Sequence, residues 1–170
     1  MRDFGRITGR VEIFDSRGDK LWDCSNMITN GGLQAFAILS STNWNLDSES
    51  ANGREYSPTY VHLGDDSWSG VDLNADVKSL KSPIDTYIPS TGTSRSVDSS
   101  IKTEDLIDLG GNSVTYQFDY LNTGTSALSI RELGLFSKNR ILLAYERING
   151  ATISAELEMT LLIKWTITFK

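Results

Sequence analysis

The chain has 170 residues, of which 39% are hydrophobic and 22% are charged, and its formal net charge is −6. This length suits a single domain over residues 1–170 with one core, and the composition excludes a disordered or collagen-like chain. The acidic balance argues against proteins that bind nucleic acid by neutralising its phosphates, so we expect no nucleic-acid partner.

The N-terminal residues Met1 to Arg6 lack the apolar stretch of a signal peptide, and no window approaches the roughly 18 apolar residues of a membrane span. We therefore expect no membrane partner and synthesis in the cytoplasm of the producing cell, with export only inside a larger assembly. Cys24 is the only cysteine and cannot form a disulfide within the chain. We interpret it as a small, half-buried residue.

The first 25 residues predict a β-hairpin. Apolar and polar residues alternate over 6–14, turn residues follow, and apolar residues return over 20–24. The turn contains Arg17-Gly18-Asp19, which spells an integrin-binding tripeptide. Gly and Asp are ordinary turn residues, so we interpret the triplet as the hairpin turn.

A short helix is predicted over 29–40, because Leu33, Phe36 and Ala37 recur at helical spacing after a Thr29 or Asn30 cap. Two long polar loops, 41–58 and 64–95, flank a short strand at 59–63. Long irregular segments in a compact domain often carry binding contacts. Trp44 and Trp68 lie in these loops, where they are either interface anchors or local loop cores.

The last third, 112–170, holds the main predicted antiparallel strands. From Leu157 to Phe169 every odd position is apolar, while even positions such as Lys164 and Thr166 are mostly polar. This predicts a half-buried strand of about 13 residues and ~43 Å, with Trp165 in the core. It exceeds the usual roughly 3–10 residues. We therefore expect part of it to contact another subunit, with Lys164 and Thr166 as interface candidates.

Gly134 lies in another predicted strand, over 129–136, and is also an interface candidate, because a glycine permits a bulge or the close approach of another backbone. Alternation places Glu132 on the face opposite to Leu133. A carboxylate there needs a partner, and Arg131 or Arg147 can serve. Together the strands, the single helix and the absence of a strand–helix–strand rhythm predict an all-β fold, an antiparallel β-sandwich or jelly roll.

No catalytic pattern stands out, and we expect no catalytic residue, no cofactor and no metal. The single histidine, His62, lies within a strand and is expected to face solvent or a neighbouring subunit. An acidic group could supply paired carboxylates for glycan hydrolysis or oxygen ligands for Ca²⁺. Aspartate is also a common loop residue, and the spacing of a calcium loop is missing. The group consists of Asp65, Asp66, Asp72 and Asp76, and its first two members, Asp65 and Asp66, are also interface candidates.

Three stretches of the chain form a pattern of short motifs. They are Ile28-Thr29-Asn30-Gly31-Gly32-Leu33, Val61-His62-Leu63-Gly64-Asp65-Asp66, and Ile130-Arg131-Glu132-Leu133-Gly134-Leu135-Phe136 followed by Ile141-Leu142-Leu143-Ala144. Together they resemble the N-terminal domain of phage tail-collar fibre proteins and related small decoration or adaptor proteins of the virion. In that family an I-T-N-x-G-L helix start precedes a V-G-x-G strand end, and an I-R-E-x-G-L-F strand precedes a G-x-L-I-A strand.

Two departures refine this expectation. An aspartate stands where the family has its second glycine after the V-G strand, and the sequence ends at Lys170, where a fibre protein would continue into a shaft. The resemblance therefore implies a stand-alone, non-enzymatic virion subunit on the tail, collar or baseplate, assembled in the host cytoplasm. Its partners would be copies of itself and other virion proteins, contacted through its loops.

Two other functions stay open from the sequence. The chain could be a capsid decoration protein, since small β-sandwiches serve at many positions of a virion. It could also be a carbohydrate-binding jelly roll, with Trp44, Trp68 and the acidic loop forming a platform for a host-surface glycan.

Overall fold

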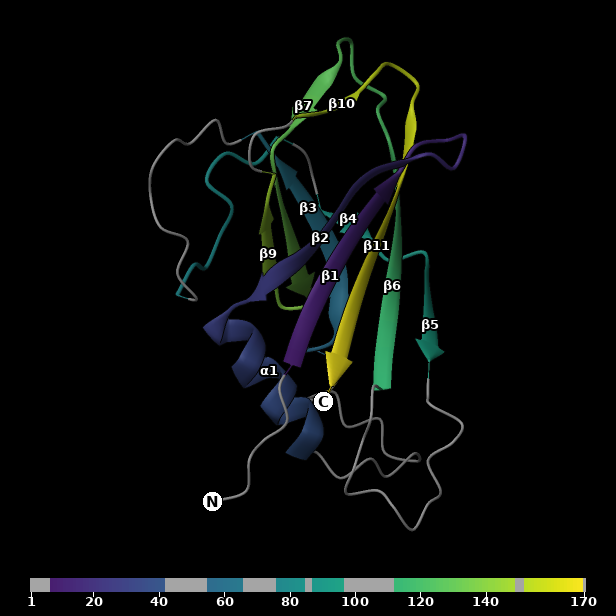
Figure 1. Cartoon of the computed structure of the whole chain (residues 1–170). Helices are drawn as coiled ribbons and strands as arrows, with labels where there is room; N and C mark the ends of the chain where they lie inside the picture. The colour runs from purple at the N-terminus through teal and green to yellow at the C-terminus, as the bar shows by residue number, and fades with distance from the viewer. Residues whose placement is uncertain are drawn as a thin grey trace.

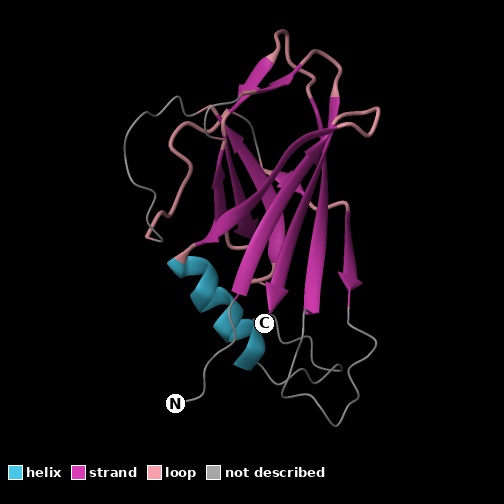
Figure 2. Ribbon diagram, viewed as in Figure 1, coloured by secondary structure: helices cyan, strands magenta, loops and turns pink. Residues whose placement is uncertain are grey.

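The computed structural model describes residues 7–41, 55–65, 76–84, 87–96, 112–148 and 152–169, which form eleven strands and one helix (Figures 1 and 2). The elements are β1 (Ile7–Phe14), β2 (Lys20–Ile28), α1 (Asn30–Ser41), β3 (Pro58–Gly64), β4 (Ile88–Pro89), β5 (Gly92–Ser96), β6 (Asn112–Leu121), β7 (Leu128–Ile130), β8 (Glu132–Ser137), β9 (Leu142–Arg147), β10 (Ile153–Ala155) and β11 (Thr160–Phe169). The predicted all-β fold with one short helix near the N-terminus is confirmed.

Nine strands form one sheet in the order β4-β3-β8-β9-β2-β1-β11-β6-β5, and β10 and β7 form a second, two-stranded sheet. Every strand pair is antiparallel. The large sheet curls until it is nearly a barrel, with β7 and β10 across one end and α1 at the other (Figure 1). We call β2, β1, β11, β6 and β5 half A, and β9, β8, β3 and β4 half B.

Two segments carry the chain from one half to the other. Strand β2 pairs with β1 over most of its length but reaches β9 only through Met27 and Ile28. On the far side, β4 pairs with β3, and two residues later β5 pairs with β6. The prediction of an irregular loop over 64–95 is therefore wrong at its C-terminal end. These strands are short and contain Pro89 and Gly92, so periodicity alone does not reveal them.

The turn of the first hairpin contains Arg17-Gly18-Asp19, as expected. The carboxylate of Asp15 accepts hydrogen bonds from the backbone amides of Arg17 and Asp19, both at 2.9 Å. Gly18 has a φ of 86°, a left-handed conformation that glycine adopts without strain. Turn geometry thus accounts for the triplet.

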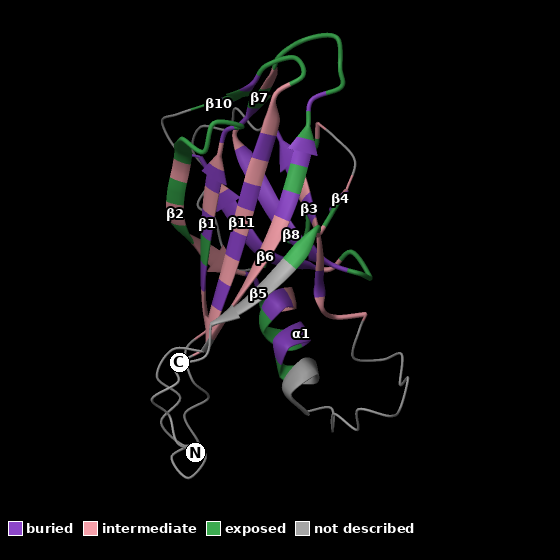
Figure 3. Ribbon diagram, turned by 90° about the vertical axis from the view of Figure 1, so that its right-hand side faces the viewer, coloured by how far each residue is buried: buried purple, intermediate pink, exposed green. Residues whose placement is uncertain are grey.

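Strands β1 and β11 of half A alternate between a buried and an outer face (Figure 3). In β11 the side chains of Leu161, Ile163, Trp165 and Ile167 are at most 1% exposed, while the residues between them are half-buried. The alternation predicted for the final strand, with Trp165 in the core, is therefore confirmed. The buried face of half A packs against the inward residues of half B in one main core.

The predicted length of the last strand is wrong. Strand β11 has 10 residues, because the chain turns before it, where the amide of Met159 donates to the carbonyl of Glu156 and Glu158 has a φ of 59°. All of β11 pairs with β6, and Leu162 to Phe169 also pair with β1. The strand is thus central within its own subunit, and its length gives no reason to invoke a second one.

Strands β8 and β9 of half B are buried on both faces, and all six residues of β8 are buried. The outward residues of these two strands, Phe136, Leu142 and Tyr145, form a second small core with Leu80. A Cβ on Gly134 would lie 2.6 Å from the Phe136 ring and 2.7 Å from Leu142 Cδ1. The glycine predicted at a subunit interface therefore makes room for the chain's own side chains.

The predicted strand over 129–136 is broken at Arg131, which separates β7 from β8. The break lets β7 pair with β10 while β8 continues between β3 and β9. Glu132 and Leu133 lie on opposite faces of β8, as alternation suggested. The partners of Glu132 are not the predicted Arg131 or Arg147. Its carboxylate accepts hydrogen bonds from Tyr145 Oη at 2.6 Å and from the backbone amides of Ser82 and Lys81 at 2.7 and 3.1 Å.

Candidate interaction face

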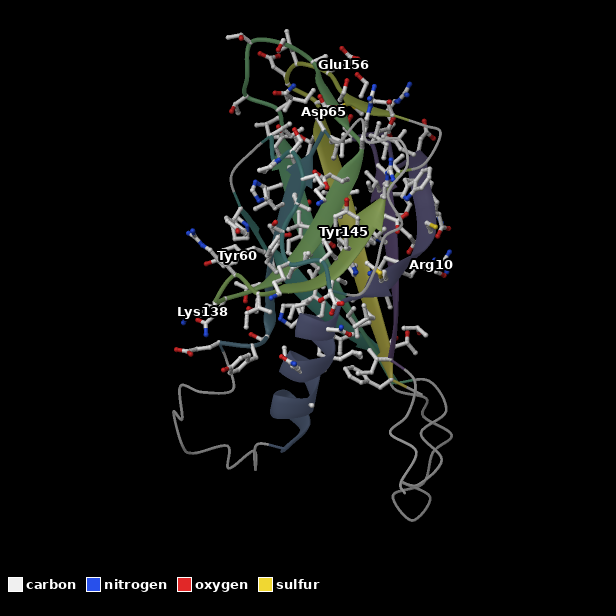
Figure 4. The ribbon with its side chains drawn as sticks, turned by 90° about the vertical axis from the view of Figure 1, so that its left-hand side faces the viewer. Arg10, Tyr60, Asp65, Lys138, Tyr145 and Glu156 are labelled. Atoms are coloured by element: carbon white, nitrogen blue, oxygen red, sulfur yellow. The ribbon has the colours of Figure 1, made fainter. Side chains whose placement is uncertain are left out.

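The outer face of half A carries a band of paired charges on β1 and β2. Arg10 makes a two-pronged contact with Asp23, at 2.7 and 2.6 Å, and Lys20 Nζ lies 2.6 Å from Glu12 and 2.9 Å from Asp23. The hydrogen bonds from Arg10 and then Lys20 hold the pKa of Asp23 far below its usual range. Figure 4 shows Arg10 on the side of the molecule opposite to Lys138.

Strand register extends this band across β11, β6 and β5. Glu12 lies opposite Lys164, Lys164 opposite Gln117, and Gln117 opposite Gly92. In the neighbouring row, the hydroxyls of Thr115 and Thr166 lie 2.8 Å apart and share a hydrogen bond. The predicted interface candidates Lys164 and Thr166 therefore lie together at the centre of the outer face.

A polar groove of about 490 Å³ opens where this face meets β5. One wall is the segment between β4 and β5, which is fixed to β6 because the amide of Thr91 donates to the carbonyl of Gln117 at 2.8 Å. The floor is set by Gly92, since a Cβ built there meets nothing within 4 Å. The row Glu12, Lys164, Gln117 and Gly92 crosses the sheet, and the missing side chain at Gly92 leaves the space of the groove. Its lining comprises Glu12, Thr91, Gly92, Thr115, Gln117, Lys164 and Thr166.

Apolar side chains are exposed near the two-stranded sheet, at the opposite end from α1. Leu121 at the end of β6 is 50% exposed, and Leu157 in the turn before β11 is 51% exposed. Leu21 at the start of β2 is 38% exposed. Exposed leucines of this kind are a typical feature of contact surfaces when they gather at one end of a domain.

A second groove, of about 710 Å³, lies beside the first turns of α1. It is lined by the exposed Leu33, by Val77 and Lys78, and by Arg140 from the β8–β9 turn. The guanidinium of Arg140 lies 4.7 Å from the centre of the Tyr87 ring. Helix, loop and turn thus meet around a depression of mixed polarity.

The three stretches of the family resemblance come together in space. Thr29 caps α1, accepting from the amide of Gly32 at 2.9 Å, and its hydroxyl donates to the carbonyl of Leu142 in β9. A Cβ on Gly32 would lie 2.0 Å from the carbonyl oxygen of Leu143, so only glycine lets the helix approach β9 this closely. On the other side of β8, Gly64 in β3 leaves room in the same way for the side chain of Glu132.

Several predicted site residues lie outside the described residues, namely Trp44, Trp68, Asp66 and Asp72. Of the remaining acidic residues, Asp65 Oδ1 lies 3.7 Å from Arg131 Nε. Asp76 Oδ1 accepts a 2.5 Å hydrogen bond from Asn30 Nδ2. The two aspartates therefore take partners from different elements. Among the residues that the structure describes, no three His, Cys, Asp or Glu side chains gather as they would around a metal ion.

His62 packs among aromatic rings on the outer face of half B. Its ring centre lies 4.6 Å from that of Tyr87 and 6.2 Å from that of Phe136. These rings cover only part of His62, which stays half-buried on the outer face, so its expected contact with solvent or another subunit stays a prediction. The sequence could not reveal the packing against Tyr87, because Tyr87 follows a long segment without periodicity.

Glu146 is a second buried carboxyl group that sequence reasoning missed. It is 5% exposed, and Trp22 Nε1 donates to it at 3.2 Å across the opening between β2 and β9. Burial raises the pKa of Glu146 to about 7, although the bonds from Trp22 and Cys24 favour its charged form. Burial and the neighbouring Glu146 also raise the pKa of the Cys24 thiol.

Comparison of this chain with family models, curated proteins and solved structures finds no match. None of the helices in the described ranges has the length and apolar character needed to span a membrane. The fold places the chain in the class of antiparallel all-β proteins.

Proposed function

We propose that this chain is a non-enzymatic structural subunit of a tailed-phage particle, forming a symmetric oligomer on the tail, collar or baseplate. The observation that carries the proposal is the joining of the three resembling stretches into one packed unit. The start of α1 lies against β9 through Thr29 and Gly32, and β3 lies against β8 through Gly64 and Glu132. The motif residues thus have a shared architectural role.

The exposed surfaces support contacts with neighbouring subunits. Leu121 and Leu157 present apolar side chains at one end of the barrel, and the groove beside α1 combines Leu33 with the charged Lys78 and Arg140. Apolar anchors with charged surroundings are typical of protein interfaces. Particle proteins generally assemble with closed symmetry, so one such end would repeat around an axis.

The proposal is tested by the oligomeric state of the purified chain and by its presence in particles. Light scattering is expected to show a defined oligomer, and mass spectrometry of purified virions is expected to detect the chain. Leu121→Asp combined with Leu157→Asp should weaken self-association, because a charge in an apolar contact must be desolvated. Ser126→Asp, in a nearby exposed turn, is the matched control.

A strictly monomeric chain at high concentration, absent from every particle, would overturn the proposal. A low-resolution map of the particle separates the tail, collar and baseplate positions from the alternative of capsid decoration. In the decoration case the chain would lie on the head surface, with the same oligomer and the same contact residues.

A further inference from the structure

We propose that the polar groove on the outer face of half A binds a neutral saccharide. This role goes beyond a structural place in a particle and uses a different surface from the apolar end at Leu121 and Leu157. The groove volume of about 490 Å³ lies within the roughly 300–1,000 Å³ typical of small-molecule sites.

The lining offers hydrogen-bonding groups of both kinds. Lys164 supplies an ammonium donor, Gln117 an amide that both donates and accepts, and Glu12 a carboxylate acceptor. The hydroxyls of Thr91 and Thr166 add groups that donate or accept. A sugar hydroxyl also donates and accepts, so each hydroxyl of a bound ring finds a complementary partner.

The charged groups of the lining favour neither sign of ion. Glu12 and Lys164 carry opposite charges, so the lining has no net charge and gives no net attraction to an anion or to a cation. The ammonium of Lys164 lies 5.1 Å from the centre of the Phe14 ring, a contact that orients it without engaging a carboxylate. A neutral polyhydroxylated ring is the ligand class that fits this set.

The groove is held open before any ligand arrives. Its wall is fixed by two bonds to the carbonyl of Gln117, one from the Thr91 amide at 2.8 Å and one from the Ser90 hydroxyl at 3.2 Å. Thr115 and Thr166 are fixed by their mutual hydrogen bond. Binding therefore costs little ordering of the protein. No aromatic side chain lines the groove among the described residues, so affinity is expected near the millimolar range.

The test is a nuclear magnetic resonance titration of the full chain, labelled with ¹⁵N, with D-glucose, D-galactose and N-acetyl-D-glucosamine. At least one neutral sugar is expected to shift the side-chain amide signals of Gln117 and the backbone amides of Gly92 and Lys164. N-acetylneuraminic acid, which carries a carboxylate, is expected to bind no more tightly than the neutral sugars, because Glu12 offsets the attraction of Lys164.

Gly92→Gln is the decisive variant. Its side chain enters open space, so the fold should persist while the groove is filled, and sugar affinity should fall by about tenfold or more. Ser25→Gln, which adds the same side chain elsewhere on the outer face, is the matched control and should bind normally. Lys164→Met removes the ammonium without filling the groove and is also expected to weaken binding.

Absence of any saturable shift with all three neutral sugars would overturn the inference, as would binding unaffected by both Gly92→Gln and Lys164→Met. If no sugar binds the unaltered chain and these variants change its oligomeric state, the inference is overturned and the groove is a contact between copies of the chain. The proposed role in a particle has its own tests, the Leu121→Asp and Leu157→Asp variant and the mass spectrometry of virions. Sugar binding and the structural role can therefore fail independently.

Discussion

The two halves of the barrel bury their strands in different ways. Half A keeps one face in the core and one outer face of charged and hydroxyl side chains, whereas β8 and β9 of half B are buried on both faces. Half B achieves this because Val77, Leu80 and Tyr87 pack against Phe136 and Tyr145 on its outer side. The difference indicates that half A retains surface for ligands or neighbours, while half B has used most of its outer surface for stability.

The largest expected effect comes from the core of half A. Trp165→Ala removes a fully buried indole and should lower the free energy of unfolding by about 3–5 kcal/mol, a large share of a domain's roughly 5–15 kcal/mol. Urea denaturation measures the change. Trp165→Phe should cost less, because it keeps an aromatic ring and removes an indole Nε1 that has no hydrogen-bond partner among the described residues. A fully tolerant Trp165→Ala would refute the assignment of the inner face.

The next largest effect is the pH dependence of stability caused by Glu146, which lies on β9 beside β2. Its folded pKa of about 7 is above the ordinary value of 4.5, so the unfolded chain ionises first as pH rises. The stability contributed by the neutral group is fully present below about pH 4.5 and is lost as pH rises through about 7, by roughly 3 kcal/mol in total. Unfolding measured between pH 5 and 8 should show this decline, and Glu146→Gln should flatten it. An equally steep decline in the variant would assign the effect to another group.

A smaller effect is expected on the outer face of half B. Glu132→Leu leaves the amides of Lys81 and Ser82 and the hydroxyl of Tyr145 without their acceptor, and should cost about 2 kcal/mol. Hydrogen exchange should rise first in residues 80–84, which the carboxylate fastens to β8. Arg147→Ala is the control, since Arg147 is the partner that alternation suggested, and it should change stability much less.

The smallest effect is expected on the outer face of half A. Lys164→Ala should change the free energy of unfolding by less than about 0.5 kcal/mol, because its side chain is only half-buried. Thr166→Ala should cost up to about 1 kcal/mol, because it also loses the cross-strand hydrogen bond to Thr115. Differential scanning calorimetry of the two variants checks this. Losses comparable to that of Trp165→Ala would mean that the outer face of half A is as essential to folding as the inner one.

This contrast also explains what could be predicted from sequence. The alternation of β11 and the cap of α1 are local patterns, and both were predicted, the cap as Thr29 or Asn30, of which the structure shows Thr29. The break at Arg131, the acceptor role of Glu132 and the short strands around Pro89 and Gly92 depend on contacts between residues far apart in the chain. A doubly buried strand such as β8 also lacks alternation, so its two faces are not distinguishable by period.

The candidate site was only partly predictable, for the same reason. Lys164 and Thr166 were identified as outward residues, since a period of two assigns faces. The groove beside them was not predicted, because it depends on Gly92 pairing opposite Gln117. Glu146 was missed because nothing in its local sequence shows that Trp22, far earlier in the chain, lies against it.

The position of β11 has a consequence for how the molecule is made. The last strand of the sheet lies between β1, near the beginning of the chain, and β6. During synthesis the first hairpin can form early, but β1 and β6 cannot be joined until β11 has left the ribosome. Until then Val11, Ile13 and Phe118 lack their neighbours Ile163 and Trp165 on the inner face, and their apolar surface is open to other chains. Contacts of such long sequence separation fold slowly, so the yield of native protein should depend on how well the nascent chain is protected from aggregation.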